Sequence, residues 1–205
     1  DVCVDDVRRL VADKDAIAVG PGLGQSKQVA DLVLSLFRES DCPMILDADA
    51  LNVVADYEMF GRVDSSPTCI LTPHPGEFAR LTGISTTEIQ GGREEAARDF
   101  AEKHGVIVVL KGAGTVVTDG DRVFINSTGN SGMATGGSGD VLTGIIAAQV
   151  SQGLSLFDAA SIAVWVHGKA GDLAAEEMSE RGLIASDLLR FLGAAWGYVE
   201  GESTG

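Results

Sequence analysis

Short apolar runs alternate with longer amphipathic segments along this chain, a pattern typical of an α/β fold with a mainly parallel sheet. Apolar runs predict strands over 16–19, 44–46, 69–71 and 106–110. The turn signal Asp119-Gly120 predicts a hairpin over 115–119 and 122–126. Apolar residues at helical spacing predict a helix over 26–38, and charge pairs four residues apart with a terminal Gly105 predict one over 93–104. Long segments rich in alanine and other apolar residues predict helices over 141–152, 156–178 and 186–196. No internal repeat or shift in composition divides the chain, so we expect residues 1–205 to form a single domain.

The composition limits the partners. Of the 205 residues 45% are apolar, the mean hydropathy is +0.17 and the net charge is -15. Because so acidic a surface repels nucleic acid and anionic lipid, and no apolar run approaches the ~18 residues of a membrane span, we expect neither partner. Three widely spaced cysteines, Cys3, Cys42 and Cys69, favour reduced thiols in a cytoplasmic protein over a disulfide or zinc site.

The strongest chemical signal is a glycine-rich run that enters a predicted helix. Residues 130–140 read NSGMATGGSGD, and an apolar helix follows from Val141. Successive backbone N–H groups of residues 136–139 at a helix start would form an anion site suited to phosphate. Asp140 then has two interpretations, a helix N-cap or a catalytic base, and the glycines ahead of it favour the base.

Two further glycine-rich segments follow predicted strands. Residues 111–115 read KGAGT, where the glycines would let a nucleotide approach the backbone while Lys111 or Thr115 contacts phosphate or ribose. An ordinary connection between a strand and a hairpin is the alternative. Residues 20–24 read GPGLG, which lacks the GxGxxG spacing of a dinucleotide-binding fingerprint and is more typical of a tight wall around a ligand.

Polar side chains follow two of the predicted strands. Asp47, Asp49 and Asn52 could hold Mg²⁺ or hydrogen-bond a polyhydroxylated substrate, although Asp49 could equally cap a helix that starts there. His74 lies between two prolines that stiffen its backbone, and Glu77 follows three residues later, where it could act on a metal or a phosphate. A structural role for His74 is the alternative, but its place at a strand end favours a ligand contact.

Together these segments closely resemble the ADP/ATP-dependent NAD(P)H-hydrate dehydratase family of the ribokinase-like superfamily, in its bacterial or archaeal form. The matching motifs are GPGLGQ (20–25), DADALN (47–52), LTPHPGEFARL (71–81), KGAGT (111–115), GMATGGSGDVLTGII (132–146), HGKAGD (167–172) and ASDLL (185–189). The resemblance implies a three-layer α/β/α sandwich with a mainly parallel central sheet. It also implies a repair enzyme that uses ADP, or ATP, to phosphorylate the added hydroxyl of hydrated NAD(P)H and then eliminates phosphate.

The resemblance assigns site residues as well. The implied nucleotide contacts are Lys111, Gly112, Ala113, Gly114, Thr115, Asn130, Gly136, Gly137, Ser138 and Gly139. Gly24, His74 and Asp140 would contact the hydrated cofactor, with Asp140 as the base. We expect Mg²⁺ to accompany the nucleotide, with Glu77 and Asp47 as its candidate ligands, and we expect a homo-oligomer, a tetramer being one candidate.

The family normally begins with a further strand–helix unit, and nothing before Ala16 matches it. Two alternative functions stay open at this point. A kinase of the same superfamily, acting on a vitamin precursor or a sugar, would share the glycine run and the aspartate. A non-catalytic nucleotide-binding protein is the other alternative, whereas a NAD-dependent oxidoreductase would leave the TGGSGD segment unexplained.

Overall fold

The computed structural model describes residues 4–61 and 68–201, and within them six strands form one sheet in the order β1-β2-β3-β4-β5-β6. The parallel strands are β1 (Ile17–Val19), β2 (Met44–Leu46), β3 (Cys69–Leu71) and β4 (Ile107–Leu110). The antiparallel hairpin is formed by β5 (Val116–Thr118) and β6 (Val123–Ile125). The predicted mainly parallel sheet and its terminal hairpin are therefore confirmed.

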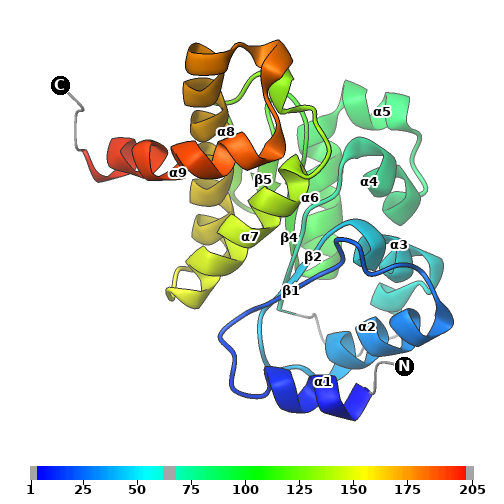
Figure 1. The fold of residues 1–205 in the computed structure, drawn as a ribbon. Coiled ribbons are helices and arrows are strands. Elements are labelled where there is room, and N and C mark those ends of the chain that lie inside the picture. Colours follow the sequence, from blue (N-terminus) through cyan, green and yellow to red (C-terminus); the bar gives the residue numbers. More distant parts are fainter. Residues whose placement is uncertain (1–3, 62–67, 202–205) are drawn as a thin grey trace.

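The crossover helices lie on one face of the sheet (Figure 1). Each parallel strand pairs with the next one along the chain, and right-handed crossovers that always advance in one direction place their helices on the same side. These helices are α2 (Lys27–Glu39), α3 (Ala48–Asp56), α4 (Pro75–Thr82), α5 (Thr86–Gly91) and α6 (Arg93–His104). The short helix α1 (Val4–Val11) packs against α2, and a 3-10 turn, η1 (Met59–Gly61), follows α3.

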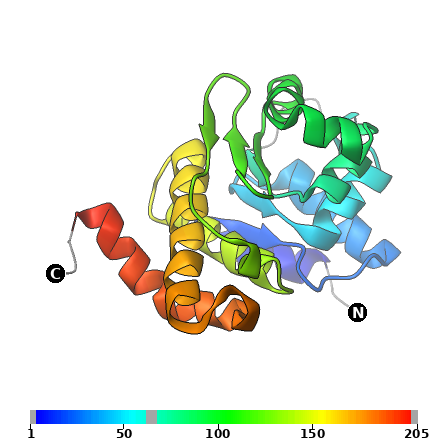
Figure 2. The same ribbon diagram turned by 90° about the horizontal axis from the view of Figure 1, so that it is seen from above.

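The last third of the chain covers the opposite face. Helices α7 (Ser138–Ser151) and α8 (Leu156–Met178) pack on the sheet, and α9 (Ala185–Glu200) crosses α8 (Figure 2). The 3-10 turns η2 (Ser131–Met133) and η3 (Glu180–Gly182) lie beside each other near the ends of α7 and α8. The result is the expected α/β/α sandwich of three layers.

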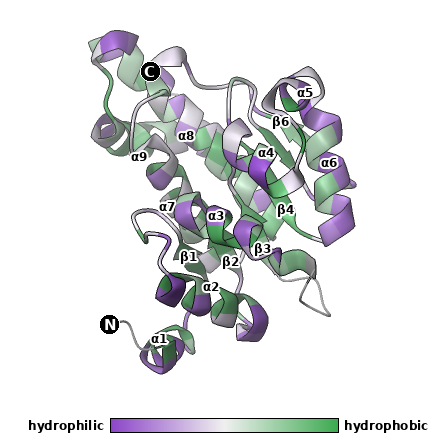
Figure 3. Ribbon diagram, turned by 90° about the vertical axis from the view of Figure 1, so that its right-hand side faces the viewer, coloured by the Kyte–Doolittle hydropathy of each residue, from purple (hydrophilic) through white to green (hydrophobic). Residues whose placement is uncertain are grey.

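The strands are buried on both faces and so carry continuous apolar runs. Ile45 and Ile70 point into the core under α7 and α8, whereas their neighbours along each strand point into the core under the crossover helices. Figure 3 shows the central strands largely in green, whereas helices such as α6 alternate between green and purple. This double burial explains why unbroken β-branched runs predicted the strands so well.

The structure differs from the sequence predictions mainly in the helices. Helix α7 begins at Ser138, three residues before the predicted start, because a serine and a glycine of the loop form part of its first turn. The short helices α1, α4 and α5 were not predicted, since their apolar patterns are brief. Capping boxes at His74 and Ser85 start α4 and α5, in each case with a glutamate three residues later.

Two other predictions concern the thiols and the membrane. Cys69 is buried and Cys42 half-buried, and neither forms a disulfide, as expected for reduced thiols; Cys3 lies outside the described residues. Over 4–61 and 68–201, no helix combines the length and the apolar character needed to cross a bilayer.

Candidate active site

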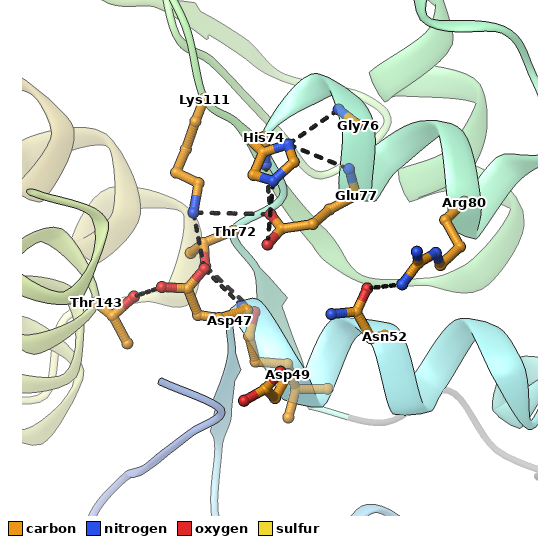
Figure 4. Close-up of polar contacts among 12 residues, drawn as sticks. Asp47, Asp49, Asn52, Thr72, His74, Gly76, Glu77, Arg80, Lys111 and Thr143 are labelled. Atoms are coloured by element: carbon orange, nitrogen blue, oxygen red, sulfur yellow. Dashed lines mark hydrogen bonds and ion pairs between the residues drawn. The ribbon is translucent and has the colours of Figure 1, made fainter. Parts of the chain in front are cut away.

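Polar side chains gather where the parallel strands end. Asp47 follows β2, His74 lies just beyond β3, and Lys111 follows β4 directly, so the three meet at one edge of the sheet (Figure 4). Ligands of open α/β sheets bind at this edge. The three segments that the sequence singled out as DADALN, HPGE and KGAGT are therefore brought together.

Asp47 is the centre of this group. Its Oδ1 accepts hydrogen bonds from Lys111 Nζ (2.8 Å) and from the backbone of Ala48 (2.9 Å), and its Oδ2 accepts one from Thr143 Oγ1 (2.8 Å). The side chain of Asp47 is only 1% exposed and that of Lys111 is 20% exposed. Burial disfavours the charged carboxylate, yet the Lys111 ammonium and the hydroxyl groups of Thr143 and Thr72 outweigh it and lower the pKa of Asp47.

His74 and Glu77 form the N-terminal cap of α4. His74 Nδ1 accepts hydrogen bonds from the backbone of Gly76 (3.0 Å) and of Glu77 (3.2 Å), while Glu77 Oε2 accepts one from the His74 backbone (2.8 Å). The cap fixes the imidazole through Nδ1, so Nε2 carries the proton when the ring is neutral. The His74 side chain is 57% exposed, which keeps it accessible for the predicted substrate contact as well.

The contacts of the two predicted metal ligands test whether Mg²⁺ fits there. The Lys111 ammonium already lies 2.8 Å from Asp47 Oδ1, and a hydroxyl group and a backbone amide also donate to this buried carboxylate. Asp47 therefore has a cationic partner within the chain, and its role as a ligand of Mg²⁺ stays a prediction. Glu77 Oε1 is freer, with His74 Nε2 at 3.5 Å. Among the described residues no group of three or more His, Cys, Asp or Glu side chains could hold a metal ion, so a magnesium ion here would depend on phosphate oxygens and water.

The glycine-rich run folds into the first turn of α7. Gly137 is the N-cap and has a φ of 89°, in the left-handed region that favours glycine. Asp140 is the third residue of the helix, so its interpretation as the N-cap is wrong. Its side chain is exposed and accepts no hydrogen bond from any residue within 4–61 and 68–201. An unengaged carboxylate at this place is what a catalytic base requires.

The N-terminus of α7 also provides free amides. The backbone N–H groups of Gly136, Gly137, Gly139 and Asp140, which we call the amide cradle, have no acceptor in the part of the chain that the structure describes. Free N–H groups and the helix dipole together attract an anion. The amide cradle can therefore donate hydrogen bonds to a phosphate, as the sequence predicts.

A buried histidine that the sequence did not single out supports this turn. His167, on α8, lies with Nε2 3.0 Å from the carbonyl oxygen of Ser138 and 3.3 Å from its hydroxyl. Since a carbonyl only accepts, Nε2 carries the proton and donates. Burial lowers the pKa of His167 to about 4, so the ring is neutral near pH 7. The HGKAGD motif was its only signal in the sequence.

Helix α8 also holds the loop that precedes the amide cradle. Asp172 accepts hydrogen bonds from the Gly129 backbone (2.9 Å) and from Asn130 Nδ2 (3.1 Å), while Asn130 Oδ1 accepts one from Gly132 (3.0 Å). The Asn130 side chain is thus engaged in shaping the loop. A nucleotide contact by Asn130 remains a prediction.

The GPGLG loop is fixed to α3. Asp49 Oδ2 accepts a hydrogen bond from the Gly24 backbone (2.8 Å), and Asp49 Oδ1 accepts one from Gln25 Nε2 (3.1 Å). Asp47 is the N-cap of α3, so the interpretation of Asp49 as the cap is wrong. Gly24 lies at the same edge of the sheet, where its substrate role stays a prediction.

The KGAGT segment connects β4 to β5. Gly112 and Gly114 have φ values of 147° and 64°, and Thr115 Oγ1 donates to the Gly112 carbonyl (2.9 Å), which closes a tight turn. Arg93 donates to the carbonyl of Leu110 (2.8 Å) from outside the turn. Ala113 is exposed at its tip. The loop is thus both a strand connection and a backbone surface open to a ligand.

The sheet order and the covering helices define an α/β protein of ribokinase-like fold. A ribokinase-like protein of Enterococcus faecalis shares this fold at a TM-score of 0.80, with 25% identity over 100% of this chain and 70% of its own. The family model described as NAD(P)H-hydrate dehydratase matches residues 3–192. The chain belongs to this family.

The similar proteins include curated enzymes and a solved structure. The bifunctional NAD(P)H-hydrate repair enzyme Nnr of Moorella thermoacetica is 45% identical over 92% of this chain and 36% of its own length. The ADP-dependent (S)-NAD(P)H-hydrate dehydratase of Bacillus subtilis is 40% identical over 88% of this chain and 63% of its own length. The crystal structure of the ADP/ATP-dependent enzyme from Bacillus subtilis, co-crystallised with ATP and Mg²⁺ and soaked with CoA, superposes with a TM-score of 0.78 and 36% identity over 92% of this chain and 70% of its own. The chain thus spans about a third of the bifunctional relative.

Replacing Gly137 by alanine is expected to weaken ADP binding by about 10- to 100-fold. This is the effect of losing one or two hydrogen bonds from the amide cradle to the charged phosphate. The added methyl group would lie 3.2 Å from Ala185 Cβ, and the φ of 89° strains any residue with a side chain. Calorimetric titration with ADP measures the effect. Gly153→Ala is the matched control, since Gly153 has the same φ of 89° at the other end of α7 and open space around it. Equal ADP affinities in the two variants would contradict the role of the cradle.

Proposed function

We propose that this protein is an ADP-dependent NAD(P)H-hydrate dehydratase, which restores hydrated NAD(P)H by phosphorylating the ring hydroxyl and eliminating phosphate. The observation that carries the proposal is the pairing of the amide cradle with the unengaged carboxylate of Asp140 on the same helix turn. Family membership and the names of the relatives support the choice of substrate.

The chemistry follows from these groups. The hydroxyl oxygen of the hydrated ring attacks the terminal phosphoryl group of ADP, its proton passes to Asp140, and AMP leaves. The amide cradle donates hydrogen bonds to the phosphoryl oxygens, where negative charge increases. The new phosphate ester then loses phosphate together with a ring proton, which restores the double bond of the dihydropyridine.

Magnesium and the remaining contacts are also proposals. Mg²⁺ bound with the nucleotide would neutralise phosphate charge, held by phosphate oxygens and water with Glu77 as the candidate protein ligand. His74 and Gly24 would contact the hydrated cofactor, and residues 111–115 the nucleotide. A cytoplasmic location and a homo-oligomer stay predictions.

The test is incubation of the purified protein with NADPHX, ADP and Mg²⁺. We expect NADPH absorbance to recover with AMP and phosphate formed in equal amounts, and excess EDTA to abolish the recovery. A phosphorylated product that persists without NADPH would indicate a small-molecule kinase instead. ADP binding with no consumption of either substrate would indicate a non-catalytic nucleotide-binding protein.

A further inference from the structure

The carboxylate of Asp47 links three parts of the fold that lie far apart in the chain. Lys111 is 64 residues away and Thr143 is 96 residues away, yet each makes a 2.8 Å hydrogen bond to it. Thr143 lies one turn after Asp140 on α7, so the two share a face of that helix. The bond from Thr143 therefore fixes the rotation of α7, and with it the direction in which Asp140 points.

The Lys111 ammonium lies beside the amide cradle. A Cβ atom added to Gly139 would lie 3.3 Å from Lys111 Nζ and 3.8 Å from Asp47 Oδ2. An ammonium has three N–H groups, of which one binds Asp47 at 2.8 Å and another faces Glu77 Oε2 at 3.9 Å. No further acceptor for the third lies among residues 4–61 and 68–201. A positive charge with a free donor thus borders the site for phosphate.

We infer that Asp47 is a positioning residue for phosphate binding, which acts through Lys111 and not through a metal ion. It holds the ammonium against the first turn of α7, where the free N–H meets the phosphoryl group. The carboxylate is buried and accepts three hydrogen bonds, while the ammonium is the more exposed partner of the pair. The inference rests on the proposed function in one respect only, namely that a nucleotide phosphate occupies the amide cradle.

The test is a double-mutant cycle read by calorimetric titration with ADP, both with Mg²⁺ and in EDTA. Lys111→Met should weaken ADP binding by about tenfold, the loss of a charge-assisted hydrogen bond. Asp47→Asn, which keeps the size and the acceptor for Thr143, should weaken it by about three- to tenfold because the ammonium loses its anchor. The double variant should bind as Lys111→Met does, within about twofold, since Asp47 has nothing left to position.

The titrations with Mg²⁺ and in EDTA distinguish a positioning role of Asp47 from a role as a metal ligand. Under our inference the effect of Asp47→Asn persists in EDTA. An effect that disappears in EDTA, or losses that add in the double variant, would make Asp47 a metal ligand and overturn the inference. Arg122→Met removes the cation from an exposed pair with Asp119, also at 2.8 Å, and should leave ADP affinity unchanged.

Thermal unfolding is a second measurement, which tests the inference even if Asp47→Asn folds poorly. Lys111→Met leaves a buried carboxylate uncompensated and should lower Tm, whereas removal of both charges should restore part of that loss. A double variant no more stable than Lys111→Met would overturn the coupling. If the wild type binds ADP with this coupling but never restores NADPH, the proposed function fails while the role of Asp47 stands.

Discussion

Replacing Asp140 by asparagine will lower the rate of NADPH recovery by about 10²–10⁴-fold, the usual contribution of a positioned general base. Asparagine keeps the size of the side chain but cannot take the proton of the attacking hydroxyl. Asp140 lies in the first turn of α7. The change should therefore cost at most ~1 kcal/mol of stability, the value of a charge near a helix N-terminus. ADP affinity should hold or rise, because a negative charge next to the phosphates is removed.

The control for this experiment is Asp158→Asn. Asp158 is also the third residue of a helix, α8, where it accepts a hydrogen bond from Ser155 Oγ (2.5 Å). Asp158→Asn should lose at least as much stability as Asp140→Asn, because only Asp158 accepts such a hydrogen bond, and only Asp140→Asn should lose turnover. Recovery of NADPH absorbance and thermal unfolding measure the two effects. Near wild-type turnover by Asp140→Asn would show that the carboxylate is dispensable and that the mechanism is wrong.

Replacing Gly20 by alanine should destabilise the fold by about 1–3 kcal/mol through backbone strain and by about another 1–3 kcal/mol through overpacking. Gly20 has a φ of 135°, and a Cβ atom there would collide with the carbonyl oxygen of Asp47. The backbone of Asp47 must then shift, which also disturbs its bond to Lys111. Urea denaturation measures the loss of stability.

Gly22→Ala is the control that separates the cost of backbone strain from the cost of the collision with Asp47. Gly22 has a φ of 67° but open space around it, so its substitution should cost only about 1–2 kcal/mol. If both variants lose equal stability, the close approach of the first loop to Asp47 has no energetic importance.

The sequence predicted the elements that depend on local pattern. The buried run from Ile107 to Leu110 and the Asp119-Gly120 turn signal correctly predicted β4 and the hairpin. Helix α6 (Arg93–His104) matches its predicted bounds, because its charge pairs four residues apart and the glycine that ends it, Gly105, are local signals. The short helices were not predicted because their formation depends on caps and on packing against neighbouring elements more than on periodicity.

The site was harder to predict because its contacts are not local. The sequence correctly suggested that the strand ends converge, but not that Lys111 would neutralise Asp47 or that Thr143 would bind the same carboxylate. Periodicity places residues on a face, yet it does not tell which side chains meet across 64 or 96 residues. His167 was overlooked for the same reason, since its partner, the Ser138 carbonyl, is a backbone atom.

The order of the layers has a consequence for synthesis on the ribosome. All the described strands precede α7 in the chain, and the sheet face that bears Ile45 and Ile70 is covered by α7 and α8, with residues of α9 packed at its edge. A nascent chain that has emerged only as far as the hairpin would pair its strands and pack the crossover helices, but it would display an uncovered apolar face that chaperones bind. Thr143 is synthesised after all the described strands, so its bond to Asp47 can form only once those strands have left the ribosome.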